Sequence, residues 1–149
     1  MATKRPSPFP FPPKRYYTGA NVPMRVIRRY ARAIAERFQP DKIILFGSHA
    51  YGAPHEDSDV DLLVIKPTWS QHSQAVQIRW ALAPPFPMDL IVRTPKNMKW
   101  RLEEGDLFLT EIVSKGKVLY EKDDPRVGSQ GRSRSRRRPA KQPRKNAPA

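Results

Sequence analysis

The hydrophobic positions of residues 23–122 follow two alternating patterns, a helical spacing in some stretches and short continuous runs in others. Ile27, Tyr30, Ile34 and Phe38 recur at helical spacing, and Pro40 ends that helix. Residues that favour helix starts open the predicted helices, which cover 23–38, 70–82, 94–104 and 106–114. Short apolar runs predict strands at 42–46, 60–65, 88–93 and 117–121.

The alternation of helices with short strands predicts an α+β fold, a small mixed β-sheet packed against helices. The last strand, 117–121, is expected at an edge of this sheet. Three tryptophans, Trp69, Trp80 and Trp100, fall in or beside predicted helices. Because aromatic side chains dominate protein cores, we expect these three to pack in the interior rather than to stack on nucleobases.

The segment between the first two predicted strands carries the candidate chemistry. Gly47 and Ser48 form a turn directly after the run 42–46, and Asp59 and Asp61 stand at the start of the next run. Successive side chains of a strand alternate between faces, so these two carboxylates point the same way, roughly 7 Å apart. Neighbouring carboxylates repel unless a cation lies between them, and Gly47 permits close approach of the backbone to a ligand. The pattern indicates a metal-dependent phosphate site.

Asp89 opens the run 88–93 and completes this set if its strand lies beside the strand that carries Asp61. Aspartate, glycine and serine also mark turns and strand ends for structural reasons, but unpaired carboxylates beside a buried run have no packing role. Two other residues leave alternatives open. His49 either contacts phosphate or faces solvent, and Arg93 either assists a polyphosphate or pairs with a neighbouring acid.

The sequence Gly47-Ser48, followed about ten residues later by Ser58-Asp59-Val60-Asp61-Leu62 and then by Asp89, resembles the nucleotidyltransferase signature of the DNA polymerase β superfamily. The small size and the final strand are similar to the minimal nucleotidyltransferases, which are often encoded as antitoxin-type partners of HEPN-domain toxins. The resemblance covers roughly residues 24–122 and implies the DNA polymerase β-like nucleotidyltransferase fold. Tyr51 departs from a frequent family variant, which has an arginine before the second glycine, so compensation of triphosphate charge is less complete.

The resemblance implies a metal-dependent transfer of a nucleoside monophosphate, in the leading interpretation AMP from ATP, to a hydroxyl group. Asp59 and Asp61 would bridge two Mg²⁺ ions, and Asp89 would hold the ion on the nucleophile side and accept the proton. The expected nucleotide-binding residues are Gly47, Ser48 and Ser58. The acceptor is expected on a partner protein such as a HEPN toxin. Occlusion of that partner without catalysis, and transfer to a small molecule or a nucleic-acid end, are the alternatives.

Composition excludes several other classes of protein. The chain has 149 residues and no cysteine, which rules out disulfides and thiolate metal sites, and its three histidines lack zinc-site spacing. No apolar run is long enough to span a membrane, and the proline-rich start is a poor signal peptide. We therefore expect a cytoplasmic protein.

The formal charge of +14 is distributed unevenly along the chain. Residues 1–21 carry four basic side chains and residues 125–149 carry nine, with no acid in either, whereas residues 22–124 hold fifteen basic and fourteen acidic ones. We expect a Pro-rich basic arm at 1–21, the nucleotidyltransferase domain at 22–124 and a disordered Arg/Lys-rich tail at 125–149. The tail can bind nucleic acid by counterion release, whereas the nearly neutral domain does not resemble a module that wraps duplex DNA.

Overall fold

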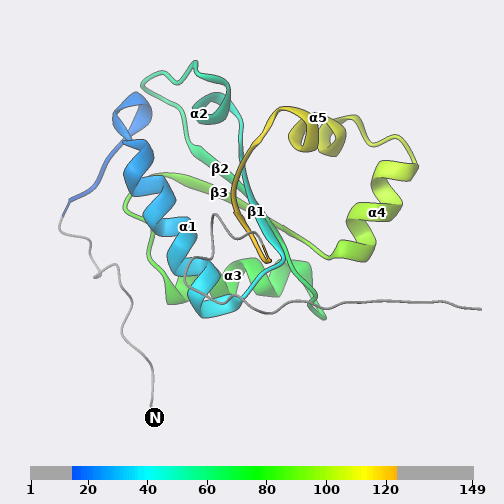
Figure 1. The fold of residues 1–149 in the computed structure, drawn as a ribbon. Helices are drawn as coiled ribbons and strands as arrows, with labels where there is room; N and C mark the ends of the chain where they lie inside the picture. The colour runs from blue at the N-terminus through cyan, green and yellow to red at the C-terminus, as the bar shows by residue number, and fades with distance from the viewer. Residues whose placement is uncertain (1–14, 124–149) are drawn as a thin grey trace, which may run out of the picture.

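The computed structural model describes residues 15–123, so the first fourteen residues of the predicted arm and the whole predicted tail lie outside the described residues (Figure 1). No helix within this range combines the length and the apolar character that crossing a bilayer requires. The elements, in chain order, are a 3₁₀ turn η1 (Gly19–Asn21), α1 (Met24–Phe38), β1 (Lys42–Phe46), α2 (Ser48–Tyr51), β2 (Val60–Ile65), α3 (Gln71–Ala81), β3 (Met88–Arg93), α4 (Pro95–Glu103), α5 (Leu107–Lys115) and β4 (Lys117–Glu121).

The four strands form one mixed sheet in the order β3-β2-β1-β4. β1 pairs antiparallel with both β2 and β4, whereas β2 pairs parallel with β3. The predicted α+β class and the edge position of the last strand are confirmed. The predicted boundaries of the strands agree with the structure, because each strand is a short apolar run enclosed by turn residues.

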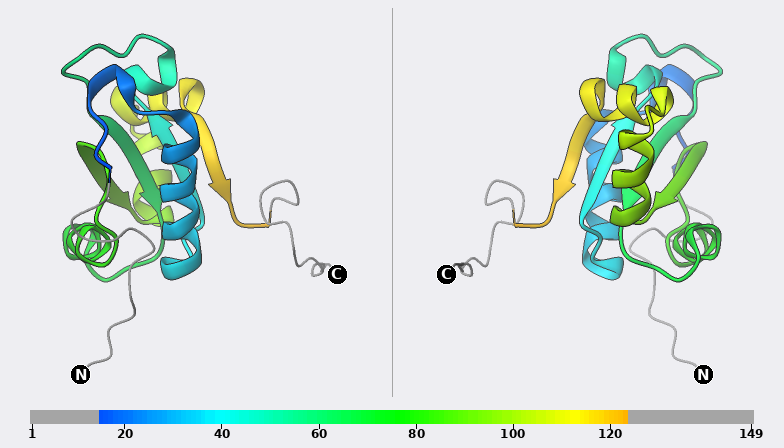
Figure 2. Two further views of the ribbon diagram at one scale, coloured as in Figure 1. Left: turned by 90° about the vertical axis from the view of Figure 1, so that its left-hand side faces the viewer. Right: turned by 90° about the vertical axis from the view of Figure 1, so that its right-hand side faces the viewer.

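Helices cover both faces of the sheet, and each face has its own core (Figures 1 and 2). In β1, Ile43 and Leu45 face the core that contains α1 and α3. Ile44 and Phe46 face the second core, which contains residues of α4 and α5. Because both faces of the central strands are buried, their sequences are continuous apolar runs rather than alternating ones.

Side-chain caps begin three of the helices where the sequence placed them. The Ser70 hydroxyl accepts from the Ser73 amide at 3.2 Å, the Thr94 hydroxyl accepts from the Asn97 amide at 3.0 Å, and Asp106 Oδ1 accepts from the Leu109 amide at 3.0 Å. Each cap satisfies one backbone donor that has no partner within its helix. These local bonds fix where α3, α4 and α5 start.

The expectation that the tryptophans pack in the interior is wrong. Trp69, Trp80 and Trp100 are 104%, 84% and 56% exposed. The inward positions of α3 are taken by Gln74 and Ile78, and Met98 takes the inward position of α4. Residue type alone indicated burial, but the rotation of α3 and α4 on the sheet turns Trp80 and Trp100 outward, and Trp69 lies in the loop before α3.

Tyr30 joins α1 to the segment between α3 and β3. Its ring is fully buried and packs edge to face on Phe86, with 5.5 Å between ring centroids. Its hydroxyl donates a hydrogen bond of 2.7 Å to the carbonyl of Leu82, which is also fully buried. Burial raises the pKa of the Tyr30 phenol above its ordinary value.

Tyr30→Phe is expected to lower the free energy of unfolding by about 1–2 kcal/mol, because the Leu82 carbonyl would stay buried without its donor. Urea denaturation of the purified protein measures this change. Tyr16→Phe is the matched control, because Tyr16 is exposed and its hydroxyl supports no buried group. Equal stability of the two variants would show that the buried hydrogen bond contributes nothing net.

Candidate active site

Asp61 and Asp89 lie side by side on the sheet. The parallel pairing of β2 with β3 places these two residues directly opposite each other, and the same register continues to the pair Ile65 and Arg93. The strand of Asp89 therefore lies next to the strand of Asp61, as the sequence interpretation required. Both carboxylates belong to the face that α4 and α5 cover, near the start of their strands.

The Asp61 carboxylate also contacts the Gly47 turn. Phe46 is the β1 partner of Asp61, and a Cβ atom added to Gly47 would collide with Asp61 Oδ2. Gly47 has φ +76°, which is a conformation that glycine adopts at little cost. Glycine at this position thus serves two purposes: it adopts φ +76° with ψ −162°, a conformation almost restricted to glycine, and it leaves room for a carboxylate.

The surroundings of Asp61 disfavour its ionised form. Burial raises the pKa of this carboxyl to about 6, and the negative charges of Asp89 and Asp59 and a hydrogen bond with Asp89 add to the effect. A carboxyl pair of this kind gains most from a bound cation, because a positive charge offsets the repulsion and replaces lost hydration.

Asp59 is not in the position that strand alternation predicted. It precedes β2 and is exposed, so it is not part of the regular pleat. Its negative charge adds to the rise in the pKa of Asp61. The same charge opposes the lowering of the His49 pKa by burial. Within residues 15–123, no three acidic or histidine side chains converge as a ready metal-binding group. The structure thus pairs two of the three predicted ligands and leaves the third beside them.

The short helix α2 and the loop between it and β2 hold the remaining predicted residues. His49 is buried rather than facing solvent, and burial lowers its pKa while a hydrogen bond to the Ser58 backbone opposes the shift. The Ser58 hydroxyl accepts from the His55 amide at 2.9 Å. Ser48 begins α2, directly after Gly47, and its carbonyl accepts from the amides of residues 52 and 53. Ser58 is buried and shapes this loop.

A pocket of about 360 Å³ opens beside the carboxylate pair, a size suited to a small-molecule ligand. Three acids, four apolar residues, one glycine and one tyrosine line it: Asp61, Asp89, Glu111, Phe46, Ile91, Phe108, Ile112, Gly47 and Tyr51. No basic side chain of the described chain is among them. Ser48, Ser58 and Asp59 do not line this pocket.

Glu111 and Phe108 are pocket residues that the sequence analysis missed. Both lie on α5, and Phe108 packs edge to face on Phe46 with 5.6 Å between ring centroids. Phe108, Glu111 and Ile112 share one side of the helix at positions i, i+3 and i+4. This spacing was visible in the sequence, but nothing in the sequence indicated that α5 packs on β1 beside Gly47.

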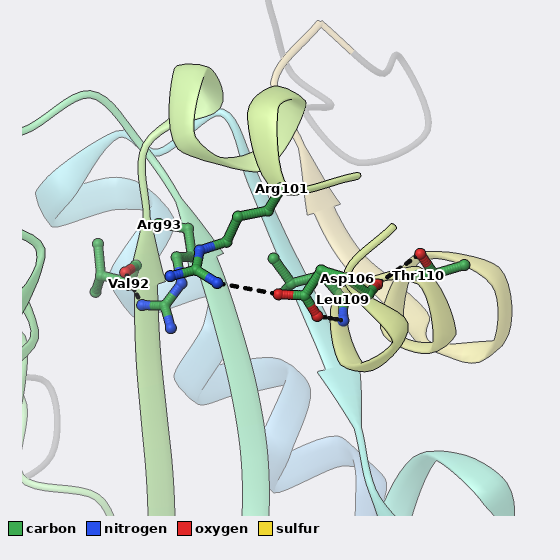
Figure 3. Close-up of polar contacts among 6 residues, drawn as sticks. All are labelled: Val92, Arg93, Arg101, Asp106, Leu109 and Thr110. Carbon is green, nitrogen blue, oxygen red and sulfur yellow. Dashed lines mark hydrogen bonds and ion pairs between the residues drawn. The ribbon is translucent and has the colours of Figure 1, made fainter. Parts of the chain in front are cut away.

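Arg93 lies on the same sheet face as Asp89 but outside the pocket. Its guanidinium donates to the Val92 carbonyl at 3.0 Å, and burial, followed by the charge of Arg101, lowers its pKa (Figure 3). Arg101 in turn bonds Asp106 Oδ2 at 3.1 Å (Figure 3). Because Asp106 also caps α5, this bond joins α4 to the helix that carries Glu111.

The residues present fit a hard divalent cation such as Mg²⁺. Carboxylate oxygens are the ligands that Mg²⁺ prefers, and a site formed by one or two carboxylates plus phosphate oxygens is typical for it. The raised pKa of Asp61 and the space that Gly47 leaves at its carboxylate are consistent with a cation between the two strands.

Comparison with known proteins gives the family. The nucleotidyltransferase domain model matches residues 27–119, which is more than half of the chain. The chain belongs to the nucleotidyltransferase domain family. This nucleotidyltransferase is therefore an enzyme of the transferase class, and the matched region spans the strands that carry the carboxylate pair.

The other comparisons add little to this family match. A crystal structure from Sulfolobus solfataricus, described provisionally as a nucleotidyltransferase, shares 10% sequence identity with a TM-score of 0.45. The similarity covers 67% of this chain and 81% of that chain, and it is too distant to support an argument. No protein of curated function matches the sequence.

Gly47→Ala is expected to disrupt the site, and Gly52→Ala is its matched control. Both glycines have positive φ, but an added Cβ meets nothing within 4 Å at Gly52. We expect a loss of stability of about 1 kcal/mol for Gly52→Ala from backbone strain alone. Gly47→Ala should lose more, and Mg²⁺ should no longer raise its melting temperature. Similar behaviour of the two variants in thermal melts would contradict the contact with Asp61.

Asp61→Asn is expected to change how stability depends on pH when metal is removed with a chelator. Because the pKa of Asp61 is raised to about 6, the unfolded chain releases this proton at lower pH than the folded chain. The free energy of unfolding of the wild type therefore falls as the pH rises from about 4 to 6. Above about pH 6 it stays lower by the full amount, because Asp61 is then ionised in both states. The melting temperature of the variant minus that of the wild type should rise across this window and then level off. A constant difference would show that Asp61 is not perturbed.

Proposed function

We propose that this nucleotidyltransferase moves AMP from ATP, with Mg²⁺, to a hydroxyl group on a partner protein of the HEPN type. The observation that carries the proposal is the carboxylate pair Asp61 and Asp89 at an open pocket with one apolar wall. A pocket of this composition suits a nucleoside whose phosphates reach a cation held by the carboxylates.

Three carboxylates have assigned roles in the proposal. Asp61 and Asp89, with Asp59 as the third ligand, would hold Mg²⁺. When bound, the metal supplies charge neutralisation of the polyphosphate and activation of the attacking hydroxyl. Asp89 is on the edge strand and exposed, so it is the carboxylate placed to receive the proton of an acceptor that arrives from solvent.

The nucleotide would be held by the walls of the pocket. Phe46, Ile91 and Phe108 offer an apolar surface to the base, and Glu111 offers an acceptor for nucleoside donors. Gly47 lines the pocket and Ser48 directly follows it, so the backbone of this turn would approach the phosphates. Ser58 would act indirectly, by holding the loop that precedes Asp59.

A macromolecular acceptor is favoured by the surface beside the pocket. Leu107 and Phe108 at the start of α5 are 83% and 50% exposed, and Tyr51 of α2 is also exposed. These exposed side chains offer contacts to a second protein. The same surface is compatible with occlusion of the partner without catalysis, and the following experiment separates the two roles.

Asp89→Asn is expected to stop transfer while leaving ATP bound through the remaining residues, because the carboxylate on the nucleophile side is lost. The protein is co-expressed with a candidate HEPN partner, and the intact mass of the partner is measured. Wild type should add one or more nucleotide masses and Asp89→Asn should add none. Asp123→Asn, at an exposed acid beyond β4, is the control and should behave as wild type.

Two outcomes would contradict the proposal. If the partner is neutralised by wild type but its mass is unchanged, the protein acts by occlusion. If nucleotide label appears on the partner with Asp89→Asn as well, the carboxylate pair is not the catalytic centre.

A further inference from the structure

The solvent face of α1 is a row of arginines. Arg25, Arg28, Arg29 and Arg32 recur at positions i, i+3, i+4 and i+7, and all four are exposed. The opposite side of the helix is apolar and is buried in the core. The first acidic residue of the chain, Glu36, comes only in the last turn of this helix.

This arrangement costs the isolated protein free energy. Like charges three and four residues apart on a helix repel each other. The positive charges also begin in the first turn, where the helix dipole favours negative charge and where α1 has no acid. Within the described residues, Arg25, Arg28 and Arg32 form no ion pair that would relieve this repulsion.

The net charge of residues 22–124 is close to zero, so it gives no sign of this row of arginines. The acids that balance it lie elsewhere. Asp61, Asp89 and Glu111 line the pocket, and the charge of Asp59 acts on Asp61 beside it. α1 lies on the other face of the sheet from α4 and α5, and Figure 2 shows it along the outside of the molecule. The charge is therefore separated in space as well as balanced in number.

The row ends close to the catalytic end of the molecule. α1 runs antiparallel to β1, so its N-terminal turn lies at the end of the sheet where β1 reaches Gly47, as Figure 1 shows. The η1 turn just before α1 packs Gly19 against the backbone of Glu56, in the loop that leads to Asp59. A ligand that follows α1 from Arg32 to Arg25 covers about 10 Å and approaches this end.

We propose that the arginine face of α1, formed by Arg25, Arg28, Arg29 and Arg32, binds the phosphate backbone of a nucleic acid strand. Each phosphate that meets an arginine releases a counterion and relieves the repulsion within the row. Guanidinium groups also suit phosphate because they donate two parallel hydrogen bonds. At about 3.4 Å per nucleotide of a helical strand, the row is long enough to follow several consecutive nucleotides.

Phosphate backbone fits this face better than a protein or a lipid surface does. A stable protein interface needs a buried apolar centre, and the apolar side chains of α1 all point into the core. A membrane-surface helix needs an exposed apolar face for the same reason. Binding of nucleic acid through phosphates needs only spaced cations, which this face supplies.

The test compares two full-length variants that each lose three positive charges. Arg25→Gln, Arg28→Gln and Arg32→Gln are combined in the test variant. Lys96→Gln, Lys99→Gln and Lys117→Gln are combined in the control, because these exposed lysines lie on α4 and β4. The affinity for a fluorescent oligouridine and for the corresponding single-stranded DNA is measured by anisotropy at several salt concentrations. The C-terminal basic residues are the same in both variants.

The arginine variant should bind at least tenfold more weakly at moderate salt. The slope of log affinity against log salt should fall by about 0.7 for each lost phosphate contact, hence by about 2 in total. The control should lose much less. A further variant with the three arginines changed to lysine keeps the positive charge and should retain most of the salt dependence. If it loses binding as the glutamine variant does, the loss reflects altered folding of α1 rather than lost charge.

Three results would overturn the proposal. Equal losses in the arginine variant and the control would mean that binding follows net charge, and no loss in either would place the binding outside α1. Competition by polyglutamate as strong as that by oligouridine would assign the face to an acidic protein. Preference between RNA and DNA identifies which kind of strand the face receives.

Discussion

The parallel pairing of β2 with β3 brings two negative charges together, and the site depends on this contact. Leu62 and Val64 of β2 point into one core, whereas Asp61 and Leu63 point to the opposite face. A register shift of one residue would exchange these faces and bury charge in place of the apolar side chains. The hydrophobic pattern therefore keeps Asp61 beside Asp89 although the two carboxylates repel each other. The burial of the apolar side chains of β2 stabilises the domain. It also holds two carboxylates side by side, an arrangement that a bound cation would stabilise.

The enzyme separates its charges between two faces of the sheet. The carboxylates gather at the pocket between β2, β3 and α5, and the arginines lie along the outside of α1. A count of charges along the sequence gives a nearly neutral domain and hides this separation. Position on a helix or strand, rather than the net total, decides which anion or cation a surface attracts.

Most of the architecture could be predicted because it depends on local signals. Proline, glycine and capping side chains set the helix ends, and apolar runs set the strands, so element boundaries agreed closely with the structure. The adjacency of Asp61 and Asp89 could be stated from the sequence only as a condition, because the order of strands in a sheet is not set by their local patterns; the structure supplies the pairing. The position of Asp59 outside β2, the outward direction of Trp80 and the presence of Glu111 in the pocket depend on loop geometry and helix docking. These are contacts between distant parts of the chain, which spacing in one sequence does not specify.

The two paired carboxylates belong to strands of different rigidity. β2 lies in the interior of the sheet with a hydrogen-bonded neighbour on each side, whereas β3 is an edge strand with one. Interior strands open to solvent only with much of the domain, and edge strands open at lower free energy. Asp61 is thus a fixed reference point, and Asp89 can change its distance from it through small local movements of the edge. We therefore expect the distance between the two carboxylates to vary through β3 rather than through β2.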